Sequence, residues 1–324
     1  MPRKPRLSVP GALHHIMSRG IEGHPIFNDA IDREHFVSLL SAEIKRSGYK
    51  CYAWVLMKNH YHLLVRANES PLYCLMRPLN SKYARWFRKK YKSRGYLFQD
   101  RFKSLATQDQ GYIEELVRYI HLNPLRAGIC KTFAELDRFS WSGHAVLISR
   151  RYCAFQDVRT VLRRFSHDPG IAVQKYRTYM QDRAGGADTG NFIDIVRKSN
   201  TEVSDRKDLR CWVIGDPAFV KAALKQDAAK RLQLAACAKN GWTMKKVVEE
   251  VSQQLGIAAA EVFKRGRDNR RSMFRKVSAA LAHRSCGIPI IEIARYYGIK
   301  SSSVSRMLED GECHARQHSI SIKH

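Results

Sequence analysis

Apolar and polar residues alternate over the first 65 residues in the pattern of a half-buried β-sheet interrupted by one helix. The ranges 12–18, 52–57 and 60–65 are expected to be strands, and 32–46 is expected to be a helix. A turn is predicted at Arg19-Gly20. The short polar link Lys58-Asn59 separates two β-rich runs, which indicates that the second and third strands are neighbours.

Two further helices are expected at 80–92, which is strongly basic, and at 110–122. Thr107 or Asp109 is the expected cap of the second helix, and Pro124 is expected to end it. The order strand–helix–strand–strand–helix with hairpin-type links predicts an α+β fold with an antiparallel sheet.

After about residue 135 the pattern becomes mostly helical. The stretch 183–191 is the clearest linker, and 213–220 is expected to be a turn that opens a helix. The last third predicts helices at 247–255, 273–286, 290–297 and 301–308, with glycine stops at Gly256 and Gly298. The pattern therefore predicts a sheet-containing first part and an all-α last part.

The net charge of the chain indicates what kind of molecule the protein binds. The 57 Lys and Arg against 30 Asp and Glu give a formal net charge of +27, which opposes compaction and favours a polyanion, with nucleic acid first. No run is long and apolar enough for a membrane helix, so no membrane partner is expected. The eight cysteines form no Cys-x-x-Cys pair, and without a signal peptide they are expected to be reduced cytosolic thiols.

The strand at 60–65 carries the first candidate chemistry. Side chains alternate between the faces of a strand, so His60 and His62 share one face while Tyr61 points to the other. Two imidazoles in this arrangement can chelate a divalent cation. Two surface histidines of a half-exposed sheet would give the same short pattern.

The helix at 110–122 carries the second set of candidate catalytic residues. Its apolar stripe has a polar edge, formed by Tyr112, Tyr119 and Asn123. Tyr119 is a candidate nucleophile, and Asn123 is a candidate oxygen ligand beside it. A tyrosine at the edge of the core with its hydroxyl in water is the alternative. Pro124 favours a non-helical backbone at Asn123, which weakens this placement.

The stretch 80–104 alternates cations with aromatic rings, as in proteins that hold single-stranded nucleic acid. The candidate DNA contacts are Lys82, Arg85, Arg88, Lys89, Arg101 and Lys103. A solvated helix whose rings pack on the sheet is the alternative, and Phe98 and Phe102 are expected in the core in either case.

The helices at 290–297 and 301–308 have the spacing of a helix-turn-helix, with Ala294 and Val304 in its core. The expected recognition-helix contacts are Lys300, Ser301, Ser302, Ser303, Ser305 and Arg306. Arg265 and Arg267 in the preceding loop suit phosphates or a minor groove. A plain helical bundle is the alternative.

Four motifs occur in one order: Gly11-Ala-Leu-His-His-Ile-Met-Ser-Arg-Gly20, Met57-Lys-Asn-His-Tyr-His-Leu-Leu64, Gly95-Tyr-Leu-Phe-Gln-Asp-Arg-Phe-Lys-Ser104 and Tyr119-Ile-His-Leu-Asn-Pro-Leu-Arg-Ala-Gly128. With them, roughly residues 8–145, including Trp141-Ser142, resemble the REP-associated tyrosine transposases, which belong to the HUH single-tyrosine transposases. His-x-His alone is a weak signal, whereas four ordered motifs are a strong one.

The resemblance implies a ferredoxin-like catalytic domain that cuts and rejoins hairpin-bearing single-stranded DNA. It implies that His60 and His62 bind a divalent metal, Mg²⁺ or Mn²⁺, with Asn123 as third ligand. It further implies that Tyr119 is the nucleophile and forms a 5′-phosphotyrosine intermediate. The sequence leaves open which metal is used, which hairpin is cut, and whether the protein is a monomer or a homodimer.

The C-terminal region resembles the DNA-binding domain of the replication initiator DnaA. Lys300-Ser-Ser-Ser stands where that family usually has Asp-His-Ser-Thr, which argues against the DnaA box as target. Duplex DNA is the expected partner of this region.

The expected organisation is a catalytic domain at 1–135, a mostly helical connecting region at 136–235, a helix-turn-helix domain at 236–312 and a flexible tail at 313–324. The expected location is the cytoplasm, in association with the nucleoid. The alternative function is a sequence-specific DNA-binding regulator with an inactive transposase fold.

Overall fold

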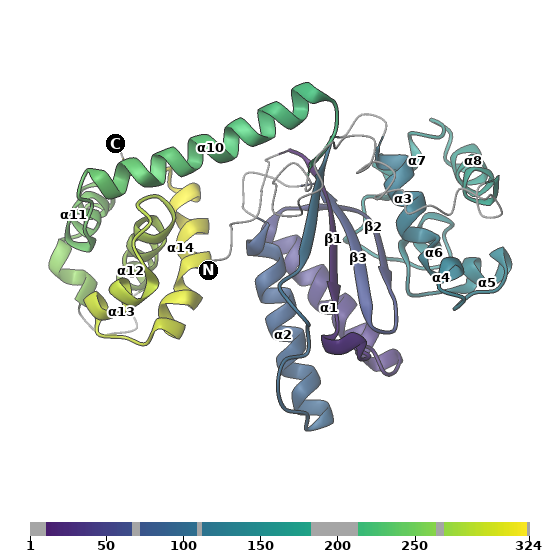
Figure 1. Cartoon of the computed structure of the whole chain (residues 1–324), viewed down its shortest axis with the longest axis horizontal. Helices are drawn as coiled ribbons and strands as arrows, with labels where there is room; N and C mark the ends of the chain where they lie inside the picture. Colours follow the sequence, from purple (N-terminus) through teal and green to yellow (C-terminus); the bar gives the residue numbers. More distant parts are fainter. Residues whose placement is uncertain (1–10, 67–71, 109–111, 183–212, 264–268, 323–324) are drawn as a thin grey trace. The chain divides into compact units, whose positions relative to one another are not determined.

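The computed structural model describes residues 11–66, 72–108, 112–182, 213–263 and 269–322. The chain divides into two compact units, Met1–Leu224 and Lys225–His324 (Figure 1). The expected divisions at residues 135 and 235 stay predictions, and the expected linker at 183–191 lies outside the described residues.

The first unit is built on a sheet whose main strands are β1 (Leu13–Arg19), β2 (Lys50–Leu56), β3 (His60–Arg66) and β4 (Lys103–Thr107). Helix α1 (Ala30–Ser47) connects β1 to β2, and α2 (Tyr73–Tyr91) connects β3 to β4. These strands lie in the order β2-β3-β1-β4, and neighbours are antiparallel. This is the ferredoxin-like α+β arrangement, as the sequence predicted.

A short fifth strand, β5 (Val213–Ile214), pairs in parallel with β4. Gln108 stabilises this junction, because its side chain accepts from the backbone of Asp216 and donates to the Asp216 carboxylate. The sequence predicted the turn and helix that follow here, but it predicted neither β4 nor β5.

Two hydrophobic cores lie on opposite faces of the sheet. The face covered by α1 and α2 buries Trp54, Tyr61 and Phe36. The other face buries Leu13, Leu64 and the apolar stripe of α3 (Ile113–His121). Alternation along β3 therefore sends Tyr61 into one core and its histidine neighbours toward α3.

The α3 side is completed by short helices: α4 (Asn123–Arg126), α5 (Phe133–Arg138), α6 (Gly143–Leu147), α7 (Val158–Leu162) and the longer α8 (Pro169–Asp182). The expected cap at Thr107 is wrong, because this residue is buried in β4 and α3 begins after Tyr112 without a side-chain cap. Asp109, the other expected cap, lies outside the described residues. Helix α3 ends at His121, before Pro124 as expected, and Pro124 lies in the first turn of the next helix, α4.

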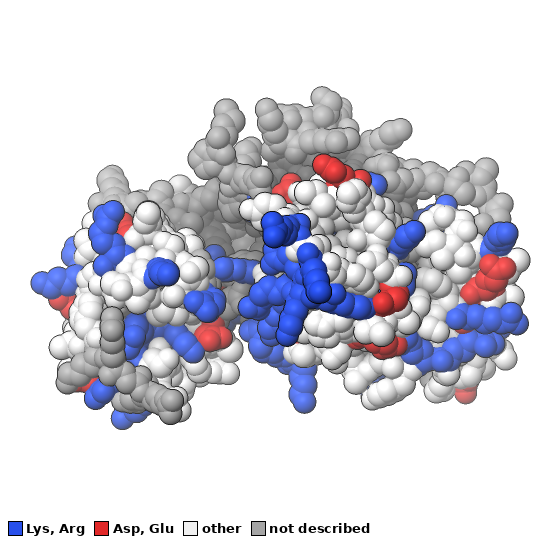
Figure 2. All heavy atoms as spheres, turned by 90° about the horizontal axis from the view of Figure 1, so that it is seen from below, with Lys and Arg blue, Asp and Glu red and all other residues white. Residues whose placement is uncertain are grey.

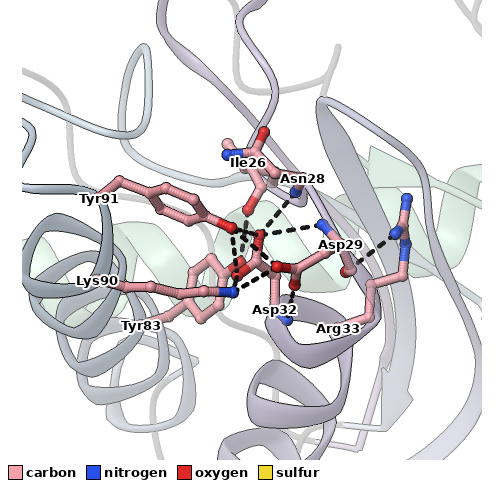
Figure 3. Close-up of polar contacts among 8 residues, drawn as sticks. All are labelled: Ile26, Asn28, Asp29, Asp32, Arg33, Tyr83, Lys90 and Tyr91. Atoms are coloured by element: carbon pink, nitrogen blue, oxygen red, sulfur yellow. Dashed lines mark hydrogen bonds and ion pairs between the residues drawn. The ribbon is translucent and has the colours of Figure 1, made fainter.

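Two carboxylates join the start of α1 to the end of α2. Asp29 and Asp32 form a capping box at the first turn of α1. The fully buried Asp32 also accepts from the backbone of Asn28, from Lys90 at 2.7 Å and from the hydroxyl of Tyr91 at 2.9 Å (Figure 3). These five residues, named the carboxylate cluster below, fix α2 against α1.

The remaining helices are α10 (Pro217–Lys239), α11 (Met244–Leu255), α12 (Asn269–Arg284), α13 (Ile290–Tyr297) and α14 (Ser301–Gln317), with a 3₁₀ turn at Ala259–Phe263. Gly256 and Gly298 end α11 and α13 in the left-handed conformation, with φ of 62° and 61°. The predicted helix–turn–helix order of α13 and α14 is therefore present, and Ala294 and Val304 lie in its core as expected.

The flexible tail expected at 313–324 is wrong up to residue 322. Helix α14 continues to Gln317, and Ala315, Ile320 and Ile322 are buried in the core of the second unit. Gln254 on α11 holds Ser321 by two hydrogen bonds, one to its carbonyl and one from its N–H. Apolar burial and backbone pairing thus order this segment.

No helix in the described part of the chain is long and apolar enough to cross a membrane. Of the eight cysteines the structure describes six, of which Cys313 is exposed and the other five are buried.

Candidate active site

The two histidines of β3 lie on the face of the sheet that α3 covers. His60 is opposite Arg19 and His62 is opposite Met17 in the antiparallel pairing with β1. Tyr61 points into the other core, where its hydroxyl donates to Asn80 at 2.5 Å. The predicted separation of the two histidines from Tyr61 is thus present.

A third histidine, His15, completes this group. It is buried on β1, and its Nε2 lies 2.9 Å from Nδ1 of His62. The ring of His62 is in turn 5.1 Å from that of His60. The ring of Tyr119 stands edge-on to His15 at 5.6 Å and to His62 at 6.1 Å. His15, His60, His62 and Tyr119 are named the histidine cluster below.

Burial keeps the paired imidazoles neutral. It lowers the pKa of His62 well below the usual value, and the neighbouring His15 and His60 lower it further. Burial also lowers the pKa of His60 to about 4, with Arg19 as the second cause. Because only neutral imidazole coordinates a metal ion, this pair keeps its ligand form at lower pH than ordinary histidines, whose pKa is about 6.5.

Tyr119 is positioned by the apolar stripe of α3. Ile113, Leu116 and Ile120 are fully buried against the sheet, which leaves Tyr119 partly buried at its edge. The guanidinium of Arg126 lies 5.0 Å from the ring centroid of Tyr119. This is a cation–π contact, which helps to hold the tyrosine ring in place.

Asn123 follows Tyr119 by one helical turn, as the sequence suggested. Its amide nitrogen donates to the backbone carbonyls of Tyr119 at 2.7 Å and Ile120 at 3.3 Å. The amide nitrogen is thus engaged with the end of α3, and the amide oxygen is the atom of Asn123 suited to a metal ion. Within the described residues, no three His, Cys, Asp or Glu side chains form a metal-binding group.

The candidate DNA contacts on α2 and in the segment after it differ in whether other protein groups already engage them. Lys82 lies 2.5 Å from the buried carboxylate of Glu43, and Arg88 donates to the backbone of Gly95. In the described part of the chain no ion pair engages the remaining ones, Arg85, Lys89, Arg101 and Lys103, and all of them are exposed. Seen from the side toward which α2 projects, Lys and Arg gather in a dense group (Figure 2).

The aromatic rings of the same stretch mostly belong to the core. Tyr83, Phe87 and Phe102 are buried, and Phe98 packs against the same cluster, as expected for Phe98 and Phe102. Tyr96 is the exception, with 81% of its surface exposed. Most of the predicted stacking surface therefore stabilises the fold instead.

In the second unit Lys300 precedes α14, and Ser301, Ser302 and Arg306 are exposed on its first turns. Ser303 is half-buried and accepts a hydrogen bond from Arg306. Arg265 and Arg267, and the side chain of Ser305, lie outside the described residues.

Sequence reasoning missed the roles of His15 and Asn59 at this site. Asn59 lies 2.7 Å from Nδ1 of His60. Asn59 directly precedes the His-x-His motif, and His15 has the correct strand parity for the cluster face. Those two signals were available, but the pairing of β1 with β3 was needed to use them.

These features define a ferredoxin-like domain with paired histidines and a tyrosine on one face of its sheet. Residues 8–123 match the family model described as "Transposase IS200 like". This stretch of the chain is therefore similar to the IS200-like transposases.

The chain is also similar to a solved structure of a REP-associated tyrosine transposase bound to a REP hairpin. The identity is 16% and the TM-score 0.38, over 49% of this chain and 93% of that chain. No curated protein matches the chain.

Proposed function

We propose that this protein is a metal-dependent transposase that cuts and rejoins single-stranded DNA through Tyr119. The carrying observation is that the Tyr119 ring contacts His15 and His62 edge-on, on the sheet face that also holds His60. The family match supports transposition as the activity. The candidate nucleophile lies on α3, the two candidate histidine ligands lie on β3, and Asn123 lies on α4.

His60, His62 and the amide oxygen of Asn123 would hold Mg²⁺ or Mn²⁺. All three ligands are neutral, and when bound the ion supplies positive charge that stabilises charge developing on the scissile phosphate. The neutrality of both imidazoles follows from their burial.

Tyr119 would attack the phosphorus, forming an O–P bond as the bond to the 3′-oxygen breaks. The tyrosine proton leaves and the 3′-oxygen gains one, which gives a 5′-phosphotyrosine linkage and a free 3′-hydroxyl. The cation–π contact with Arg126 helps to hold the ring of Tyr119 in place. Because one phosphodiester replaces another, a later 3′-hydroxyl can rejoin the strand without ATP.

The test is a denaturation-resistant protein–DNA adduct, formed with hairpin-bearing single-stranded DNA and Mn²⁺. Tyr119→Phe should abolish the adduct, whereas the matched control Tyr112→Phe, also on the edge of α3, should retain it. An adduct with Tyr119→Phe that disappears with Tyr112→Phe would move the nucleophile to Tyr112. DNA binding without any adduct from the unmodified protein would favour the regulator alternative.

The two units would divide the DNA between them. Exposed cations near α2 and the ring of Tyr96 suit an unpaired strand. The start of α14 suits a duplex groove. Tyr96→Ala should weaken binding of a bare strand by about tenfold, and Lys300→Ala with Ser302→Ala should weaken only stem-bearing DNA.

Two exposed residues provide controls for this comparison: Tyr152→Ala, 87% exposed, and Lys245→Ala on α11. Equal losses on both substrates from the α14 variant would contradict the division, and binding losses from the controls would show that any surface change suffices.

A further inference from the structure

Both candidate ligand histidines use Nδ1 inside the protein. Nδ1 of His60 lies 2.7 Å from Oδ1 of Asn59, and Nδ1 of His62 lies 2.9 Å from Nε2 of His15. A neutral imidazole has one N–H and one lone pair, so the partner at Nδ1 decides whether Nε2 can bind a metal ion.

The orientation of Asn59 is fixed by its other hydrogen bond. Its Nδ2 donates at 3.0 Å to the backbone carbonyl of Gly23, which can only accept. The amide oxygen must therefore face His60, and since it too can only accept, Nδ1 of His60 carries the proton. The lone pair of His60 is consequently on Nε2.

The turn that holds Asn59 in place requires a glycine. The N–H of Gly20 donates to the backbone carbonyl of Asn59 at 2.8 Å. A Cβ at Gly20 would lie 2.1 Å from the carbonyl oxygen of His24, a distance that no packed structure tolerates. Gly20, which follows the last residue of β1, thus positions the residue that orients His60. The turn expected at Arg19-Gly20 lies later, at Ile21–Gly23, because Arg19 still pairs with β3.

The bond between His15 and His62 has two possible proton arrangements. The two ring planes are within 5° of parallel and their centroids are 5.1 Å apart, so the hydrogen bond lies along the planes of both rings. If His15 donated, Nε2 of His62 would carry the proton and have no lone pair. Only donation from Nδ1 of His62 leaves its Nε2 able to bind a cation.

We propose that Asn59 and His15 are positioning residues that hold His60 and His62 in the Nδ1-protonated tautomer, with both Nε2 lone pairs available to a divalent cation. This rests on the proposed metal role of the two histidines. Hydrogen bonds of this kind raise metal affinity because they fix ring orientation and tautomer before binding. Asn59 and His15 come from a loop and from β1, so each ligand has its own support.

The first measurement is independent of activity: long-range proton–nitrogen NMR of the histidine rings in the metal-free protein. The unmodified protein should show the Nδ1-protonated tautomer for His60 and His62. Asn59→Ala should return His60 to a tautomer mixture, and His15→Phe should do so for His62. His14→Phe is the matched control, because His14 is the buried neighbour of His15 and contacts Ser104 instead.

The second measurement is Mn²⁺ affinity by titration. Asn59→Ala and His15→Phe should each raise the Kd about 10–100-fold, and His14→Phe should leave it unchanged. Asn59→Asp keeps an acceptor for His60 but cannot donate to Gly23, and His15→Gln keeps an acceptor for His62. Both conservative variants should restore the tautomer and bring the Kd within a few-fold of the unmodified protein.

Three results would overturn the inference: an Nε2-protonated tautomer in the unmodified protein, an unchanged Kd in both Asn59→Ala and His15→Phe, or a loss in Asn59→Asp as large as in Asn59→Ala. The last would mean that Asn59 only holds the turn at Gly23. If His60→Ala binds Mn²⁺ as well as the unmodified protein, the metal site itself is wrong, and the tautomers still decide the roles of Asn59 and His15.

Discussion

The carboxylate cluster and the histidine cluster lie on opposite sides of the same sheet. They differ in how many of their polar atoms find a hydrogen-bond partner within the protein. In the carboxylate cluster, the Asp32 carboxylate forms an ion pair with Lys90. It also accepts hydrogen bonds from the hydroxyl of Tyr91 and from two backbone N–H groups. In the histidine cluster, burial keeps His60 and His62 neutral, and in the described part of the chain no hydrogen bond engages Nε2 of either residue.

This difference indicates which cluster is structural and which is functional. A buried charge needs its partner within the fold, so a saturated cluster holds helices together and has little left to offer a ligand. Neutral donors with available lone pairs tolerate burial, yet they are completed only by something from outside. A cation is complementary to such lone pairs, and an anionic DNA phosphate could bind the cation in turn.

The largest expected effect comes from removing one ligand of the histidine cluster. His60→Ala should weaken Mn²⁺ binding by more than about 100-fold, because losing a ligand exceeds the loss of an orienting partner. Its free energy of unfolding should stay within about 1 kcal/mol of the unmodified protein, since His60 is only partly buried. Titration with Mn²⁺ and urea unfolding measure the two quantities, and a large stability loss would show that the cluster is structural.

The reverse pattern is expected for the carboxylate cluster. Asp32→Ala should lower the free energy of unfolding by about 3 kcal/mol, because it removes a fully buried acceptor from Lys90 and from two backbone N–H groups. The Kd for Mn²⁺ of the folded protein should not change. Asp100→Ala, an exposed carboxylate on the same unit, is the control and should alter neither urea unfolding nor Mn²⁺ binding.

Sequence periodicity located β1, β2, β3 and most helices because their apolar faces are regular. It missed β4, whose five residues Lys103–Thr107 have little pattern of their own and are defined by pairing with β1. It also began α2 at residue 80, after Pro78. The helix in fact starts at Tyr73 and continues through Pro78. Proline has no N–H, so the carbonyl of Cys74 lacks its usual helical partner at Pro78, and Arg46 of α1 donates to this carbonyl instead.

For the site, the motifs indicated His60, His62, Tyr119 and Asn123, and these roles stay predictions until tested. His15 could not be placed by the same reasoning, because its contact with His62 depends on strand register between distant segments. Lys82 shows the converse limit: its charge suggested DNA, but the structure places it on the buried carboxylate of Glu43. Local pattern specifies elements, whereas tertiary contacts assign side chains.

The smallest expected effect is a difference between the two sides of the sheet in how the free energy of unfolding depends on pH. His144, buried on the α3 side, has a pKa lowered by burial despite its hydrogen bond to Asp137. Its Nδ1 can accept from the hydroxyl of Tyr176 at 2.8 Å, so the fold suits the neutral ring. Asp29, in the carboxylate cluster, has a pKa lowered to about 2, chiefly by Lys90.

The lowered pKa of His144 determines the direction in which stability changes with pH. As the pH falls through about 6.5, the unfolded state takes up the proton of His144 more readily than the folded state, so stability falls. We expect His144 to account for at most about 1 kcal/mol of the stability lost between pH 6.5 and 5.5. His144→Gln should therefore show a smaller loss than the unmodified protein in urea unfolding at these two pH values. Asp29→Asn should leave the loss unchanged, because that carboxylate stays ionised over this range, and an equal effect of both variants would contradict the assignment of acid sensitivity to the α3 side.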